Sequence, residues 1–247
     1  MMQSECIQVS LPNDIALKIA SLLQVPDVCA LGSCSRFWNE LCGSDSIWES
    51  LAKERWPSLT IFHDSSSSTA IKAPISKGWR GFYIKRHKEV MGKATAVAKF
   101  VELCFSSTES LKAGEHLKAI EDVSTAQLGF KDVQMFMFKP KCNVLLNVVG
   151  LLYCIHRLGV PGEYVMEALQ SCKISERQLC VKWLKLFRFP SWSCEIRGES
   201  QSRLVSLADL AMGNEPDVLL ALQEGGIHGF FLRAQISVAD PTCTPST

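Results

Sequence analysis

Apolar residues recur at helical spacing through the opening segment of the chain, in three groups separated by turn residues. The first group follows Pro12, which suits the first turn of a helix. The second follows Pro26–Asp27, where proline fixes φ and aspartate can accept the free amide hydrogens of the next turn. The members of these two groups are Ile15, Ile19, Leu22 and Leu23, then Val28, Leu31, Cys34, Trp38 and Leu41.

A turn at Gly43–Asp45 precedes a third short stripe, which contains Trp48 and stops at Pro57. The pattern therefore predicts three short helices, the second of which could bend around Ser33–Ser35. Three short helices remove too little apolar area from water to form a stable core alone. We expect this segment to need something packed against it.

Beyond a Ser-rich stretch at residues 58–76, which predicts an exposed flexible loop, one apolar face continues from Trp79 to Phe105. It predicts a long helix over Gly78–Phe105, in which Gly92 could mark a kink. Further helices are predicted at Glu109–Val123, Asn143–Leu158, Gly162–Cys172, Ser175–Phe187, Arg203–Met212 and Pro216–Glu224. Ile227–Val238 is either a minor strand or an irregular apolar segment, so the fold class is mainly α.

Composition excludes several classes of protein. The chain has 247 residues, with 26 Lys and Arg against 25 Asp and Glu, so no global field favours nucleic acid or an anionic membrane. Its most hydrophobic run, Val144–Leu158, is short and contains Asn147 and two basic residues, so no membrane span is predicted. The 11 cysteines never form a C-x-x-C pair and no apolar signal segment opens the chain, which favours the nucleus or the cytoplasm.

The opening segment resembles an F-box, the motif that docks a protein onto the Skp-type adaptor of a cullin–RING ubiquitin ligase. The residue order and spacing that carry the resemblance are Leu11–Pro12, Asp14–Ile15, Ile19, Leu22–Leu23, Pro26–Val28, Leu31, Cys34–Arg36, Trp38, Leu41 and Ile47–Trp48. Residues 79–88 are also similar to a segment that often follows the box in plant F-box proteins.

The resemblance implies specific roles for these residues. The expected adaptor-binding residues are Leu11, Pro12, Ile15, Ile19, Leu22, Leu31 and Trp38, and the expected core of the motif is Leu23, Pro26, Val28, Leu41 and Trp48. It further implies an F-box at residues 8–57, the loop at 58–76, a helical domain at 77–238 for an unknown protein substrate, and a tail at 239–247. Such a chain would be a non-catalytic receptor subunit of an SCF-type (Skp–cullin–F-box) ligase, without a cofactor or a metal.

Other functions stay open at this point. The chain could bind the adaptor without entering a ligase. Less favoured is nucleic-acid binding, through the eight Lys and Arg between Lys72 and Lys99 or through a helix-turn-helix over residues 162–187. A cysteine nucleophile is disfavoured because no base stands at suitable spacing: Cys154 and His156 point to different faces of a helix. Trp192, in a Pro-containing polar loop, is a candidate anchor for the target.

Overall fold

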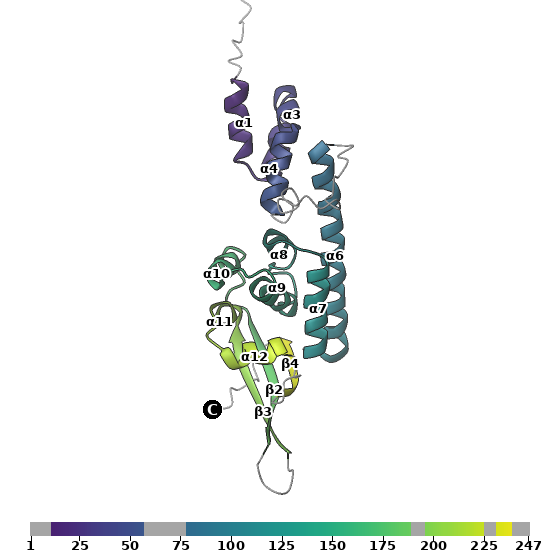
Figure 1. Ribbon diagram of the computed structural model, residues 1–247, viewed down its shortest axis with the longest axis vertical. Coiled ribbons are helices and arrows are strands. Elements are labelled where there is room, and N and C mark those ends of the chain that lie inside the picture. The colour runs from purple at the N-terminus through teal and green to yellow at the C-terminus, as the bar shows by residue number, and fades with distance from the viewer. Residues whose placement is uncertain (1–10, 57–77, 189–195, 225–230, 239–247) are drawn as a thin grey trace, which may run out of the picture. The chain divides into compact units, whose positions relative to one another are not determined.

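The computed structural model describes residues 11–56, 78–188, 196–224 and 231–238 (Figure 1). Its contacts divide the chain into two compact units, Met1–Lys88 and Glu89–Thr247. Eleven helices and four strands lie within the described residues, which confirms the mainly helical fold. The boundary between the units falls inside a long helix, whereas the sequence suggested a division before that helix begins.

The first unit begins with four short helices, α1 (Asn13–Ser21), α2 (Val25–Gly32), α3 (Arg36–Cys42) and α4 (Asp45–Arg55). The predicted second helix is two helices, because Ser35 has an extended backbone and its Oγ accepts a hydrogen bond from the backbone N–H of Trp38 at 3.3 Å. Ser35 is thus an N-cap that starts α3 afresh. Helix α1 packs against α3 and α4, and α2 packs against α3.

The long helix α6 (Gly78–Thr108) is continuous through Gly92, so the helix does not break at this glycine. Its beginning is fixed by Asp45, whose Oδ1 accepts a hydrogen bond from the backbone N–H of Trp79 at 2.8 Å. Gly78 has φ +69°, and a Cβ there would lie 2.7 Å from the same carboxylate oxygen. Glycine at this position therefore lets the carboxylate of α4 cap the first turn of α6.

The second unit is built around α9 (Val144–His156), which buries eleven of its thirteen residues. The other helices are α7 (Ala113–Thr125), α8 (Phe130–Phe136), α10 (Gly162–Ser171), α11 (Leu207–Met212) and α12 (Pro216–Glu224). Helix α9 packs against α7, α8, α10 and α11. Figure 1 shows α7 alongside the second half of α6, where the Lys118 ammonium lies 4.8 Å from the centre of the Phe100 ring.

Four antiparallel strands form a sheet against these helices, in the order β1 (Ser110–Lys112), β4 (Phe231–Val238), β2 (Gln178–Arg188) and β3 (Ile196–Ser206). Helix α9 packs on β2 and β4, and α7 packs on β1 and β4. The strand predicted as one option near the C-terminus is confirmed as β4. The sheet is nonetheless larger than the single minor strand that the sequence suggested.

The helix predicted at Ser175–Phe187 is wrong, because most of it is the central strand β2. A strand with neighbours on both sides and cover on its faces has no clean alternation of polar and apolar residues. Leu179, Cys180 and Val181 are consecutive and all buried, which resembles a buried helix in sequence. The helix-turn-helix suggested for residues 162–187 is therefore wrong as well.

Two other predicted helices begin later than expected. The segment Arg203–Met212 starts as the end of β3, and α11 begins only at Leu207. The segment Glu109–Val123 starts as β1, and α7 begins only at Ala113. The residue before it, Lys112, donates its backbone N–H to Glu115 Oε2 at 2.9 Å, which caps the helix. In both cases pairing in the sheet outweighs helix propensity in the first residues.

Candidate functional site

Helix α1 exposes its isoleucines and buries its alanines. Ile15, Ile19 and Leu22, just past its end, are 47%, 42% and 80% exposed. The residues of α1 that face inward are Ala16 and Ala20, both 0% exposed. An amphipathic helix that served only its own core would have the opposite arrangement. The outward face of α1 is therefore an apolar surface suited to a partner.

The other residues expected on this surface are partly or fully accessible. Pro12 is exposed and is the N-cap residue of α1, and its carbonyl accepts the first helical hydrogen bond, from Ala16, at 2.9 Å. Leu11, Leu31 and Trp38 are half-buried, so each presents one side to solvent. We call the set of Leu11, Pro12, Ile15, Ile19, Leu22, Leu31 and Trp38 the α1 face.

Among the residues expected in the core of the motif, Val28, Leu41 and Trp48 are buried and Leu23 is half-buried. Pro26 is exposed and does not belong to the core. It lies in the first turn of α2, where its fixed φ and missing N–H suit the start of a helix. Its contribution is therefore to the backbone of α2 and not to packing.

Trp48 and α4 are held in place by tertiary contacts that the sequence pattern does not show. The indole N–H of Trp48 donates to the carbonyl of Cys42 at 2.7 Å, which ties α4 to the end of α3. Tyr83 of α6 lies edge-on to Trp48 with ring centroids 5.3 Å apart and also contacts Trp56 at 5.0 Å. The buried Arg55 guanidinium donates to the Tyr83 hydroxyl at 2.7 Å and lies 4.9 Å from the centre of the Trp56 ring.

This aromatic and cationic cluster explains how the small helices remain ordered without burying the large side chains of α1. Two tryptophans, a tyrosine and a guanidinium are buried here and remove a large apolar area from water within the first unit. The sequence placed Trp48 on the third apolar stripe but did not show what it contacts. The contribution of Tyr83, 28 positions beyond Arg55, requires the tertiary structure.

Burial changes the acidity of several thiols in the described part of the chain. Burial raises the pKa of Cys104, Cys142, Cys154 and Cys172 above the ordinary thiol value. A nucleophilic cysteine requires the opposite change, because the thiolate is the reactive form. Within the described residues no group of three or more His, Cys, Asp or Glu could hold a metal ion, and no helix is long and apolar enough to cross a membrane.

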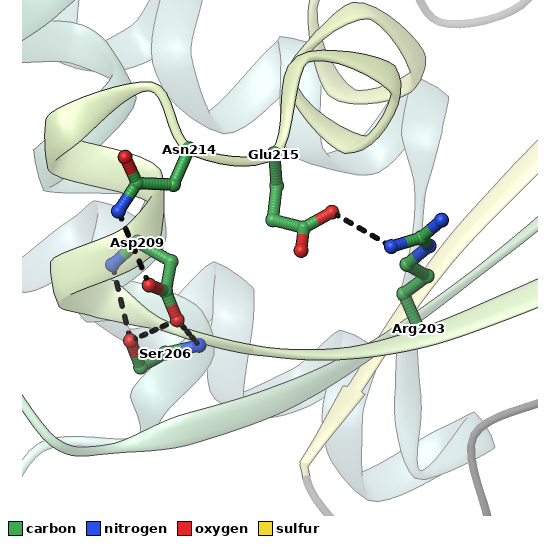
Figure 2. Close-up of polar contacts among 5 residues, drawn as sticks. All are labelled: Arg203, Ser206, Asp209, Asn214 and Glu215. Atoms are coloured by element: carbon green, nitrogen blue, oxygen red, sulfur yellow. Dashed lines mark hydrogen bonds and ion pairs between the residues drawn. The ribbon is translucent and has the colours of Figure 1, made fainter.

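A polar cluster at the start of α11 has a structural explanation (Figure 2). Ser206 Oγ accepts from the backbone N–H of Asp209 at 3.0 Å, and the backbone N–H of Ser206 donates to Asp209 Oδ2 at 3.3 Å, which is a reciprocal capping box. Ser206 Oγ also donates to Asp209 Oδ2 at 2.6 Å. The hydrogen bond from Ser206 lowers the pKa of Asp209. Nearby, Arg203 and Glu215 form an ion pair of 3.3 Å between β3 and the start of α12. These contacts end β3 and begin α11 and do not form a reactive group.

Trp192, the suggested target anchor, lies outside the described residues. Of the basic residues between Lys72 and Lys99, those on the described part of α6 are mostly exposed. They are spread along the solvated face of α6, whereas Tyr83 of the same helix is buried, so they do not alternate with exposed aromatic rings that could stack on bases.

The first unit is a small helical module with an outward apolar face on α1 and a separate aromatic core. Comparison with known families identifies it more closely: residues 9–54 match the F-box-like family. The chain therefore carries an F-box-like domain, and the resemblance seen in the sequence is confirmed. No curated protein and no solved structure matches the chain.

Proposed function

We propose that this chain is the substrate-receptor subunit of an SCF-type ubiquitin ligase. The observation that carries the proposal is the arrangement of α1, where Ile15, Ile19 and Leu22 are exposed while Ala16 and Ala20 are buried. F-box domains bind Skp-type adaptors, and an apolar helix face of this kind is what a partner helix would cover. The α1 face would dock the adaptor, and the second unit would hold a protein target.

In this function the chain transfers no ubiquitin itself. Its contribution is to raise the effective concentration of target lysines near the charged ubiquitin carrier, since both are held in one assembly. The pKa values of the buried thiols, raised by desolvation, agree with this division of labour because they disfavour a thioester step on those cysteines. The compartment we propose is the nucleus or the cytoplasm.

The experiment is co-purification of the chain with a Skp-type adaptor and a cullin from cells. The variant Ile15→Glu/Ile19→Glu places two charges on the α1 face and should reduce recovery of the adaptor by about 30-fold or more, because two central apolar anchors are lost. Leu11→Ala/Pro12→Ala should weaken it less. The matched control is Leu103→Glu, an exposed leucine of α6 in the second unit, which should recover the adaptor like the wild type.

The outcomes separate the candidate functions. Recovery of both adaptor and cullin with wild type, and loss of both with the double variant, supports the ligase receptor. Recovery of adaptor without cullin would instead identify an adaptor-binding protein outside the ligase. Equal recovery by wild type and double variant would overturn the docking role of the α1 face.

A further inference from the structure

The second unit contains two adjoining cavities that share one residue, His156 at the end of α9. The larger, of about 600 Å³, lies between α7, α9 and α12, and the smaller, of about 200 Å³, lies between α9, α10, α11 and α12. The amide nitrogen of Gln223 lies 2.8 Å from Nε2 of His156 and so links α12 to α9 between them. We call the two cavities together the His156 groove.

The larger cavity combines an apolar floor with a charged rim. Ile120, Leu152 and Leu222 are buried at its floor. Lys118, Glu121 and Arg157 line its rim, and all three are exposed. Two cations against one anion give the rim an excess of one positive charge when His156 is neutral, and burial lowers the pKa of His156, which favours that neutral form. A concave apolar site with a few convergent polar groups is the usual form of a binding site.

The charges at the rim are available to a ligand. Arg157 pairs with Glu121 at 3.0 Å, but both side chains are more than half exposed, so the pair is screened by water and weak. A ligand carboxylate can therefore compete with Glu121 for Arg157. Lys118 is held at the same rim by its contact with the Phe100 ring, 4.8 Å from the ammonium to the ring centre.

The smaller cavity differs in both size and charge. Its lining is mainly apolar, with Ile155, Leu210 and Leu219, and its one ionised residue is Glu163. The exposed Met212 also lines it, with 47% of its surface accessible. An aliphatic side chain fits this compartment, whereas an acidic one would be repelled by Glu163.

We propose that the His156 groove binds an extended peptide segment of the target, with an acidic residue in the larger compartment and an aliphatic residue in the smaller. This inference rests on the proposed function, since it gives the second unit a recognition site. Two compartments on either side of one residue suit successive side chains of a peptide better than a single compact molecule. The opposite charges of Lys118 with Arg157 and of Glu163 set the direction in which the peptide lies.

The test begins with a phage library of random 12-residue peptides selected on the full-length chain. Enriched sequences should pair an acidic residue with an aliphatic one at a constant spacing. One such peptide is then synthesised with a fluorescein label in three forms, carrying glutamate, glutamine or phosphoserine at the acidic position. Anisotropy titration should give binding of the glutamate form at least about 10-fold tighter than the glutamine form, as expected for a charge-assisted contact.

Variants of the chain assign this preference to the groove. Lys118→Glu should remove most of the difference between the glutamate and glutamine forms, and Met212→Glu should weaken both forms by about 10-fold. Lys93→Glu makes the same change as Lys118→Glu, and Leu103→Glu a change comparable to Met212→Glu. Both controls lie at exposed positions of α6 away from the groove and should leave binding unchanged. Melting temperatures of all four variants control for folding.

Several results would overturn the proposal. These are a library without enriched peptides, enriched peptides without an acidic residue, equal binding to Lys118→Glu and wild type, or binding of the phosphoserine form alone. The groove variants should also recover the adaptor like the wild type. If wild type binds the peptide but not the adaptor, the ligase function fails while the groove stands. If it binds the adaptor but no peptide, the groove fails alone.

Discussion

Helices α1 and α9 distribute their apolar side chains in opposite ways. In α9, leucine, valine and tyrosine are all buried, and even Asn147 is inside, with its amide donating to the carbonyl of Met137. In α1 the buried residues are two alanines, while two isoleucines are more than 40% exposed. Both helices carry large aliphatic residues, but α9 buries them in its own unit, whereas α1 leaves its two isoleucines exposed.

The difference shows how exposure separates residues that fold the protein from residues that bind a partner. Burial of a large aliphatic side chain contributes about 1.5 to 3 kcal/mol to folding, and a side chain left exposed contributes little of this. A large exposed residue on α1 is thus available to contribute the same kind of free energy to an interface. Substitutions in the two helices should therefore separate stability from binding.

The largest expected effect is in the core of the second unit. Leu151→Ala in α9 should lower the free energy of unfolding by about 2 to 5 kcal/mol, because Leu151 is fully buried and its removal leaves a cavity. Leu22→Ala, the same substitution at a residue 80% exposed, should change it by less than about 0.5 kcal/mol. Urea unfolding measures both. Equal losses in the two variants would contradict the distinction between α1 and α9.

A pH effect of intermediate size is expected from His116, which is 0% exposed in α7. Burial, with a smaller contribution from His156, lowers the pKa of His116 to about 4 in the folded protein, against about 6.5 when unfolded. Because the pKa of His116 is lower in the folded protein, protonation favours the unfolded chain. The free energy of unfolding is therefore highest above about pH 6.5 and falls as the pH decreases towards 4. The free energy of unfolding should decrease by about 2 kcal/mol between about pH 7.5 and pH 5.

The control for this prediction is His116→Leu, which places an apolar side chain that cannot titrate in the same buried site. Within the described residues neither ring nitrogen of His116 has a hydrogen-bond partner, so leucine removes no such contact. The variant should have a flatter stability profile over the same pH range. A profile parallel to that of the wild type would show that His116 is not the titrating group.

Two glycines inside helices give a comparison of opposite signs, and the substitution at Gly92 has the smallest expected effect. A Cβ at Gly150 of α9 would lie 2.9 Å from Val133 Cγ1 and 3.1 Å from Met137 Cβ, so Gly150→Ala should cost about 1 to 3 kcal/mol by overpacking. A Cβ at Gly92 of α6 meets no atom within 4 Å, so Gly92→Ala should stabilise by about 0.5 to 1 kcal/mol. Thermal melting of the two variants should shift in opposite directions, and shifts of the same sign would contradict this account of their surroundings.

Sequence patterning predicted the helices of both units where a stripe was long or well capped, as in α6, α9, α10 and α12. It failed at β2 because Leu179, Cys180 and Val181 are buried together, and such a run has no period that separates a strand from a helix. At the candidate site, sequence patterning predicted the helix but not which of its faces is buried. Ile15 and Ile19 are spaced like Ala16 and Ala20, so periodicity predicts a helix without saying which pair faces inward.

The supporting contacts of the site could not be predicted for a further reason. Arg55 and Tyr83 are 28 positions apart in sequence, and the pattern around each of them does not indicate that they meet. Their hydrogen bond forms only when α4 and the start of α6 pack together, which depends on the cap between Asp45 and Trp79. Tertiary packing therefore decides which polar residues are buried, and a single sequence does not contain that information in readable form.

Hydrogen–deuterium exchange of the full chain with and without a Skp-type adaptor tests the central claim most directly. The account predicts slower exchange in α1 and in α3, which carry exposed or half-buried residues of the α1 face, because an adaptor would cover them. Exchange in α9, already buried in its own unit, should stay unchanged. Adaptor binding that slowed exchange only in the second unit, or that left α1 unaffected, would contradict the account.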